Sequence, residues 1–129
     1  MSEPFIVIST WRIKEGKLED LKRFQREFAE IIQANEPQLI AFNAFYNEEG
    51  TEMTSIQVHP NPTSMDFHLK VLRETLSDAM SAVAEFIEPM SLEYYGKPPE
   101  SALSIGSQSG RNFSVKPLHM GGFTRSSVG

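Results

Sequence analysis

The 129-residue sequence contains no cysteine, which excludes disulfide bonds and thiolate metal sites. It has no run of Lys or Arg, and its formal net charge is −5. Because nucleic acids and anionic membrane surfaces are bound by clustered basic residues, neither is expected as a partner. The longest apolar run is far too short to span a membrane. Three scattered histidines without acidic residues at ligand spacing predict no metal site.

The first residues, Met1 to Pro4, lack the basic and apolar regions of a signal peptide. A cytoplasmic location is therefore expected. Hydrophobic residues make up 40% of the chain and charged residues 22%, which suits a single globular domain with one core. Neither a phosphate-binding loop nor a nucleophile elbow is present.

Hydrophobic periodicity predicts four strands and two helices in the order βαββαβ. The helices are expected at residues 17–35 and from Pro62 to about residue 85. This order favours the ferredoxin-like α+β fold, with a four-stranded antiparallel sheet in the order 4-1-3-2 and both helices on one face. The strands are expected at residues 5–13, 39–46, 52–59 and 90–95.

The second face of this sheet is also predicted to be apolar, because strands 5–13 and 39–46 do not alternate between apolar and polar residues. Such a face needs a cover, and two sheets stacked face to face give a homodimer, the dimeric α+β barrel. Residues 97–129 are rich in Gly, Ser and Pro. They are expected to form a C-terminal arm outside a domain of residues 1–96, covering the open face or packing on the partner subunit.

The third strand and second helix meet in a block that reads His59-Pro60-Asn61-Pro62, then Thr63 to Phe67, then His68-Leu69. With the βαββαβ order, this block resembles the antibiotic biosynthesis monooxygenase (ABM) family of dimeric α+β barrels over roughly residues 5–95. The resemblance implies a cofactor-independent monooxygenase acting on an aromatic, polyketide- or quinol-like small molecule, with no cofactor. The alternative is a non-catalytic dimeric module of the same fold that binds a small ligand or a partner.

Family members that degrade haem use an Asn on the first strand, a Trp at the end of the third strand and a His on the second helix. Here the first position falls on Ser9 or Trp11, and the second is His59. The helix His of those enzymes lies further along than His68. These differences argue against haem as a ligand.

Strand 52–59 turns Ser55, Gln57 and His59 to one face, although it is expected at the centre of the sheet. Burying three unpaired polar side chains would be costly. Either this face lines a polar pocket under the helices, where the family's ligands bind, or it faces water or the dimer interface. Ser9 and Trp11 share one face of the first strand and point to the same pocket.

His68 is the candidate general base, because the ordinary histidine pKa of about 6.5 suits proton transfer from a phenolic or enolic substrate. A structural histidine at the helix start is the alternative. Trp11 is assigned to catalysis with His68; it and Tyr46 either stack on a planar substrate or belong to the core. Asn43 either binds a ligand or pairs across the dimer. The residues assigned to ligand binding are Ser9, Asn43, Tyr46, Ser55, Gln57 and His59.

Overall fold

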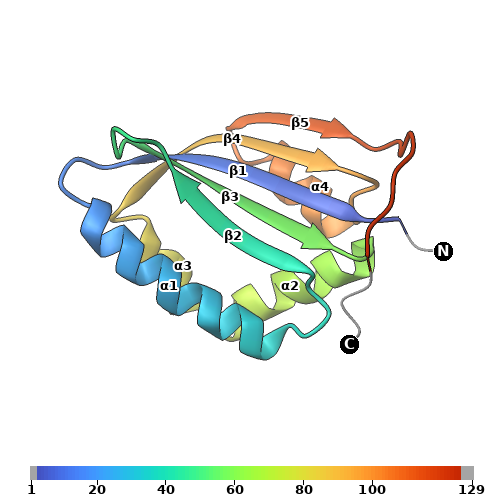
Figure 1. Cartoon of the computed structure of the whole chain (residues 1–129), viewed down its shortest axis with the longest axis horizontal. Coiled ribbons are helices and arrows are strands. Elements are labelled where there is room, and N and C mark those ends of the chain that lie inside the picture. Colours follow the sequence, from blue (N-terminus) through green and yellow to red (C-terminus); the bar gives the residue numbers. More distant parts are fainter. Residues whose placement is uncertain (1–2, 126–129) are drawn as a thin grey trace.

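The computed structural model describes residues 3–125 and shows one sheet with helices on one of its faces (Figure 1). The strand order is β2-β3-β1-β4-β5, with all neighbours antiparallel except β4 and β5, which are parallel. In chain order the elements are β1 (Phe5–Ile13), α1 (Leu18–Asn35), β2 (Ala41–Tyr46), β3 (Glu52–His59), α2 (Pro62–Glu74), α3 (Ser77–Val83), β4 (Ile87–Tyr95), α4 (Glu100–Ser107) and β5 (Asn112–Lys116).

The predicted α+β class and the order 4-1-3-2 of the first four strands are confirmed. The prediction of a four-stranded, wholly antiparallel sheet with two helices is wrong. The sheet is mixed and has five strands, and the described part of the chain holds four helices. The homodimer stays a prediction.

The second helix was expected to be continuous to about residue 85, but it breaks after Glu74. The N–H groups of Thr75 and Leu76 both donate to the carbonyl oxygen of Val71. In an unbroken helix, Leu76 would be turned about 140° away from Val71. The break allows both side chains to be buried in one cluster with Phe28 of α1.

The C-terminal segment completes the sheet of its own chain. Residues 100–116, assigned above to an arm, form α4 and β5. Ala102 of α4 is fully buried, and its carbonyl oxygen accepts a hydrogen bond from the Tyr94 hydroxyl (2.8 Å). The Phe113 ring of β5 packs edge-on against Tyr94, with ring centroids 5.1 Å apart. The Gly- and Ser-rich composition of this segment does not predict these contacts, because each contact depends on a single residue.

Residues 117–125 follow β5 without a helix or a strand. Their three large apolar side chains are 80–102% exposed. This segment is called the terminal arm below, and its apolar residues are Leu118, Met120 and Phe123.

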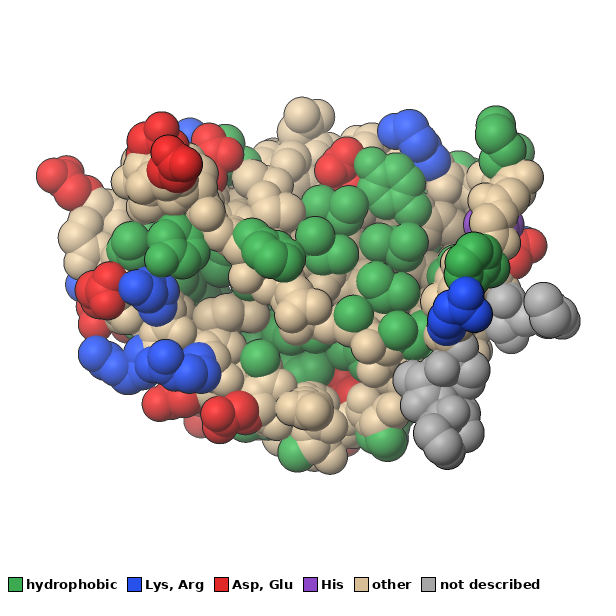
Figure 2. Space-filling model, in the orientation of Figure 1, with side chains coloured by type: hydrophobic (Ala, Val, Ile, Leu, Met, Phe, Trp, Pro, Cys, Tyr) green, Lys and Arg blue, Asp and Glu red, His purple; other side chains and the backbone are tan. Residues whose placement is uncertain are grey.

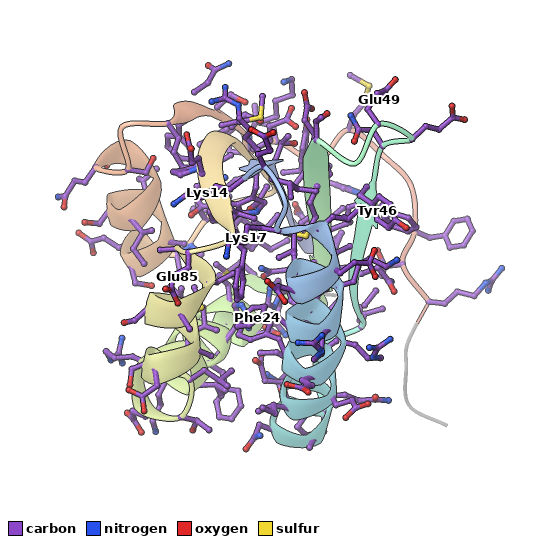
Figure 3. All side chains as sticks on the ribbon, turned by 90° about the vertical axis from the view of Figure 1, so that its left-hand side faces the viewer. Lys14, Lys17, Phe24, Tyr46, Glu49 and Glu85 are labelled. Carbon is purple, nitrogen blue, oxygen red and sulfur yellow. The ribbon has the colours of Figure 1, made fainter. Side chains whose placement is uncertain are left out.

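The two faces of the sheet differ in what covers them. One face packs on the helices, which lie to one side of the strands in the side view of Figure 3. The other face has no cover from the described residues, and hydrophobic side chains gather over its centre (Figure 2). By strand alternation, these central side chains are half-buried aliphatic residues of β1 and β3: Ile6, Ile8, Ile56 and Val58. We call this the open face. Among the described residues, no helix is both long and apolar enough to cross a membrane.

The contact between α4 and β5 depends on a glycine. A Cβ atom at Gly106 would lie 2.4 Å from the Phe113 ring, which is closer than atoms can approach. We expect Gly106→Ala to lower the free energy of unfolding by about 1 kcal/mol, because overpacking costs about 1–3 kcal/mol and the helix propensity of Ala returns up to about 1. Urea unfolding measures the change. The control is Gly121→Ala, where a Cβ meets nothing within 4 Å. Equal stability of the two variants would contradict the packing account.

Candidate active site

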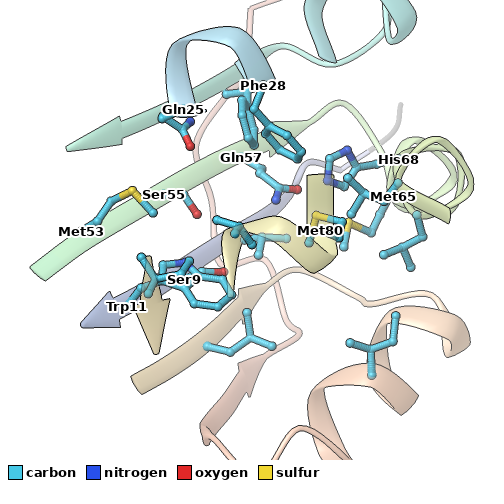
Figure 4. Close-up of a pocket in the computed structure, with 18 of the residues that line it drawn as sticks. Ser9, Trp11, Gln25, Phe28, Met53, Ser55, Gln57, Met65, His68 and Met80 are labelled. Carbon is cyan, nitrogen blue, oxygen red and sulfur yellow. The ribbon is translucent and has the colours of Figure 1, made fainter. Parts of the chain in front are cut away.

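A cavity of about 220 Å³ lies between the sheet and the helices. The close-up in Figure 4 shows Trp11 and His68 at opposite ends of this cavity, with Ser55 and Gln57 between them. The register agrees, because Val7 lies opposite Gln57 and Trp11 is four residues further along β1, a step of about 13 Å. Most of the wall is apolar; the polar side chains on it are Ser9, Gln25, Ser55, Gln57, His68 and Arg111.

The structure brings together five of the eight residues that the sequence assigns to a site. Their presence on one wall follows from the alternation of β1 and β3 and from the helix phase of α2. These cavity residues are Ser9, Trp11, Ser55, Gln57 and His68.

The other three do not line the cavity. His59 is fully buried behind the cavity wall, next to His68. Tyr46 lies near the end of the edge strand β2, half exposed, with the Lys22 ammonium 5.7 Å from its ring centroid (Figure 3). Asn43 is exposed, and its pairing with Ile56 places it on the open face. Their assignment to ligand binding remains a prediction.

His68 is held by a buried carboxylate. Its Nδ1 lies 2.8 and 3.0 Å from the two carboxylate oxygens of Glu36. Both side chains are almost inaccessible to solvent, at 2% and 0% exposure. Glu36 follows the last turn of α1, where the negative end of the helix dipole disfavours an anion. His68 is therefore the group that stabilises this carboxylate.

The Glu36 contact defines which His68 nitrogen is basic. A carboxylate oxygen accepts hydrogen bonds, so the proton of the neutral imidazole lies on Nδ1 and the lone pair on Nε2. Within residues 3–125, no side chain or backbone group hydrogen-bonds to Nε2. Because His68 lines the cavity, Nε2 can take a proton from a bound molecule, and the carboxylate stabilises the imidazolium that results.

His59 belongs to a second hydrogen-bonded chain. Its Nε2 lies 3.0 Å from Gln57 Oε1, and its Nδ1 lies 2.7 Å from Ser64 Oγ. An amide oxygen only accepts, so Nε2–H donates to Gln57 and the Ser64 hydroxyl donates to Nδ1. This fixes the Gln57 amide with its oxygen toward His59, which leaves its NH2 group as a donor for the cavity.

Burial, and then the neighbouring His68, lower the pKa of His59 to about 3. The ring is therefore neutral at ordinary pH. It serves as a fixed hydrogen-bonding link rather than as a base.

Two residues of this region were missed by the sequence analysis. Glu36 lies four and eight residues after Ile32 and Phe28, which places a carboxylate in line with the buried stripe of α1. That position was the available signal. Arg111 lies in the segment assigned to an arm, and no sequence pattern links it to Trp11, over whose ring it packs.

No family model matches the sequence, and no curated protein is similar to it. Solved structures are similar in fold. MupZ from Pseudomonas fluorescens matches 98% of both chains, with a TM-score of 0.75 and 20% identity. SnoaB, a cofactor-independent oxygenase from Streptomyces nogalater, matches 72% of this chain and 89% of its own, with a TM-score of 0.57 and 10% identity.

A provisionally named antibiotic biosynthesis monooxygenase from Caulobacter crescentus CB15 matches 72% of this chain and 88% of its own, with a TM-score of 0.63 and 16% identity. The predicted resemblance to the ABM family is thus confirmed at the level of the fold. The likeness to MupZ extends over nearly the whole chain, so it includes the segment of α4 and β5.

The depressed pKa of His59 makes stability depend on pH. Its folded value of about 3 lies below the unfolded value of about 6.5. The neutral ring therefore stabilises the fold fully above pH 6.5, and this contribution is lost as the pH falls from about 6.5 to about 3. The shift corresponds to at most about 5 kcal/mol. We expect His59→Phe to flatten the acid side of the stability curve by several kcal/mol, as measured by urea unfolding between pH 7 and pH 3.5.

His59→Phe also leaves Ser64 and Gln57 without a partner, so we expect a loss of about 1–3 kcal/mol at pH 7. The matched control is His119→Phe, because His119 is exposed. Parallel stability curves for wild type and His59→Phe would show that His59 does not titrate as described.

Proposed function

We propose that this protein is a cofactor-independent monooxygenase that acts on an aromatic, polyketide- or quinol-like small molecule. The observation that carries the proposal is the Glu36–His68 pair, in which a buried carboxylate holds Nδ1 while Nε2 remains free for the cavity. The fold shared with SnoaB supports it. The apolar wall and the Trp11 ring suit a flat, largely apolar substrate.

The proposed reaction begins with proton removal. For an anthrone, His68 Nε2 takes a proton from the CH2 group opposite the carbonyl, and the resulting enolate transfers one electron to dioxygen. Recombination of superoxide with the substrate radical forms a peroxide at that carbon. Loss of water, with the imidazolium returning its proton, gives the quinone. One oxygen atom of O2 enters the product, the other leaves as water, and the substrate supplies all the electrons.

The alternative, a non-catalytic binding module, accounts less well for the buried pair. Burying a carboxylate and an imidazole rarely adds stability, because apolar side chains of similar size do as well or better. A binding module would have no need of this arrangement. An acid–base catalyst requires an oriented imidazole with one free nitrogen.

Glu36→Gln and His68→Gln test the dyad. We expect each to lower kcat for aerobic oxidation of 1,8-dihydroxyanthrone by about 10²–10⁴-fold, the usual contribution of a general base. Oxygen uptake and quinone absorbance are the measurements. Trp11→Phe should lower turnover with little change in stability.

The controls are Glu30→Gln on the exposed side of α1 and His119→Gln, which should keep wild-type turnover. If Glu36→Gln turns over like wild type, the base assignment is wrong. If wild type itself is inactive but binds the anthrone in the cavity, the non-catalytic module is favoured.

We further propose that the protein works as a homodimer whose subunits meet through their open faces. The supporting observations are the apolar centre of that face and the three exposed apolar side chains of the terminal arm. An exposed apolar surface of this kind is typical of a face that packs on another protein. Within residues 3–125, no contact buries these three side chains, and we propose that the terminal arm packs on the partner.

Light scattering tests the dimer. We expect about twice the chain mass of 14.5 kDa, and the monomer mass for Ile56→Lys, which puts a charge at the centre of the open face. Truncation after Lys116 should weaken the dimer and leave the sheet intact. The control is Leu103→Lys, which adds a charge at an exposed apolar position on α4. A wild-type mass of one chain would refute the proposal.

A further inference from the structure

Arg111 closes the end of the cavity opposite His68. It directly precedes β5, and its guanidinium carbon lies 4.2 Å from the centroid of the Trp11 ring. Its Nη2 donates to the carbonyl oxygens of Thr10 (3.2 Å) and Ser91 (2.6 Å). These carbonyls flank the irregularity where the pairing of β1 with β4 shifts register. Arg111 therefore has a structural role, which is to bind a carbonyl group of each strand where the pairing of β1 with β4 is irregular.

That structural role uses only part of the side chain. A guanidinium carries five N–H donors, and the two carbonyls occupy those of Nη2. Nε is buried without any hydrogen-bond partner. Among residues 3–125, no acceptor hydrogen-bonds to Nη1 either. At least three donors of a cavity-lining cation thus have no acceptor in the protein.

The charge of Arg111 has no counter-ion among the described residues, whose ion pairs all involve other groups. Burial lowers the pKa of Arg111, and Tyr94 opposes this effect; the guanidinium nevertheless stays charged at neutral pH. Burial raises the pKa of Tyr94 to about 12, so the phenol next to it is neutral. A half-buried cation in an apolar cavity is costly unless an anion joins it.

We propose that Arg111 binds an anionic oxygen of the ligand, and that the molecule accepted by the cavity is a planar aromatic carboxylate. The carboxylate lies at Arg111, and its ring lies along Trp11. Anion binding at Arg111 does not depend on the chemistry at His68. The proposed monooxygenase function adds that the reacting carbon of this molecule lies near His68 Nε2, and only that placement rests on it.

The test compares two probes that differ in charge and little in shape, 2-naphthoate and 2-naphthamide. Isothermal titration calorimetry measures their binding to the full chain at pH 7.5. We expect wild type to bind 2-naphthoate at least tenfold more tightly than 2-naphthamide, because a hydrogen bond to a charged group is stronger than one between neutral groups. We expect Arg111→Gln to remove this preference. The affinity of this variant for 2-naphthoate should fall tenfold or more, while its affinity for 2-naphthamide should stay within twofold of the wild-type value.

Arg111→Lys keeps the charge and should retain part of the preference. The matched control is Arg12→Gln: Arg12 is the next residue after Trp11 but is exposed and paired with Glu88, so both affinities should stay unchanged. Trp11 is the single tryptophan of the chain, and a change in its emission on binding places the probe in the cavity.

Three results would overturn the proposal. They are no binding of 2-naphthoate to wild type, equal affinity of wild type for the two probes, or an equal loss of affinity for both probes in Arg111→Gln. The last result would show a purely structural Arg111. His68→Gln separates this proposal from the proposed function, because it should lower turnover by about 10²–10⁴-fold and leave the preference for the carboxylate in place.

Discussion

The buried hydrogen bond between Glu36 and His68 is the contact on which the account of the site depends. It joins the end of α1 to the middle of α2, two helices that cross the same sheet face. It defines the tautomer of His68 and directs its free nitrogen toward the cavity. Without Glu36, the same histidine could present either nitrogen and would have no group to stabilise its charged form.

The side chains around this pair limit which group at the cavity can accept a proton. His59 lies beside His68 but is neutral down to about pH 3, so it does not compete as a base. Its hydrogen bonds hold the Gln57 amide with a donor available to the cavity. Arg111 supplies positive charge at the other end, next to Trp11. The His68 imidazole, the Gln57 amide and the Arg111 guanidinium thus lie in sequence along one apolar cavity.

Much of this arrangement could be predicted from the sequence because it follows from periodic patterns. The alternation of β3 placed Ser55 and Gln57 on one face, and His68 was predicted as the general base for a ligand bound in a pocket there. Asn43 and Tyr46 could not be placed in the same way, because β2 is apolar on both faces and its alternation carries no information. Glu36 was missed although it stands in line with the buried stripe of α1. The fifth strand was missed although Phe113 and Val115 alternate with polar residues, because the strand is short and lies in a Gly- and Ser-rich segment. Arg111 was missed because no sequence pattern links it to Trp11.

The central claim is that the Glu36–His68 pair removes a proton from a carbon or oxygen acid in the cavity, and hydrogen exchange tests it apart from any chemistry of dioxygen. Incubated without oxygen in D2O, 1,8-dihydroxyanthrone exchanges its CH2 hydrogens at a rate that mass spectrometry follows. The account predicts that the wild-type protein accelerates this exchange and that Glu36→Gln reduces the acceleration by about 10²-fold or more. Exchange no faster than in buffer alone, or equally fast with Glu36→Gln, would contradict it.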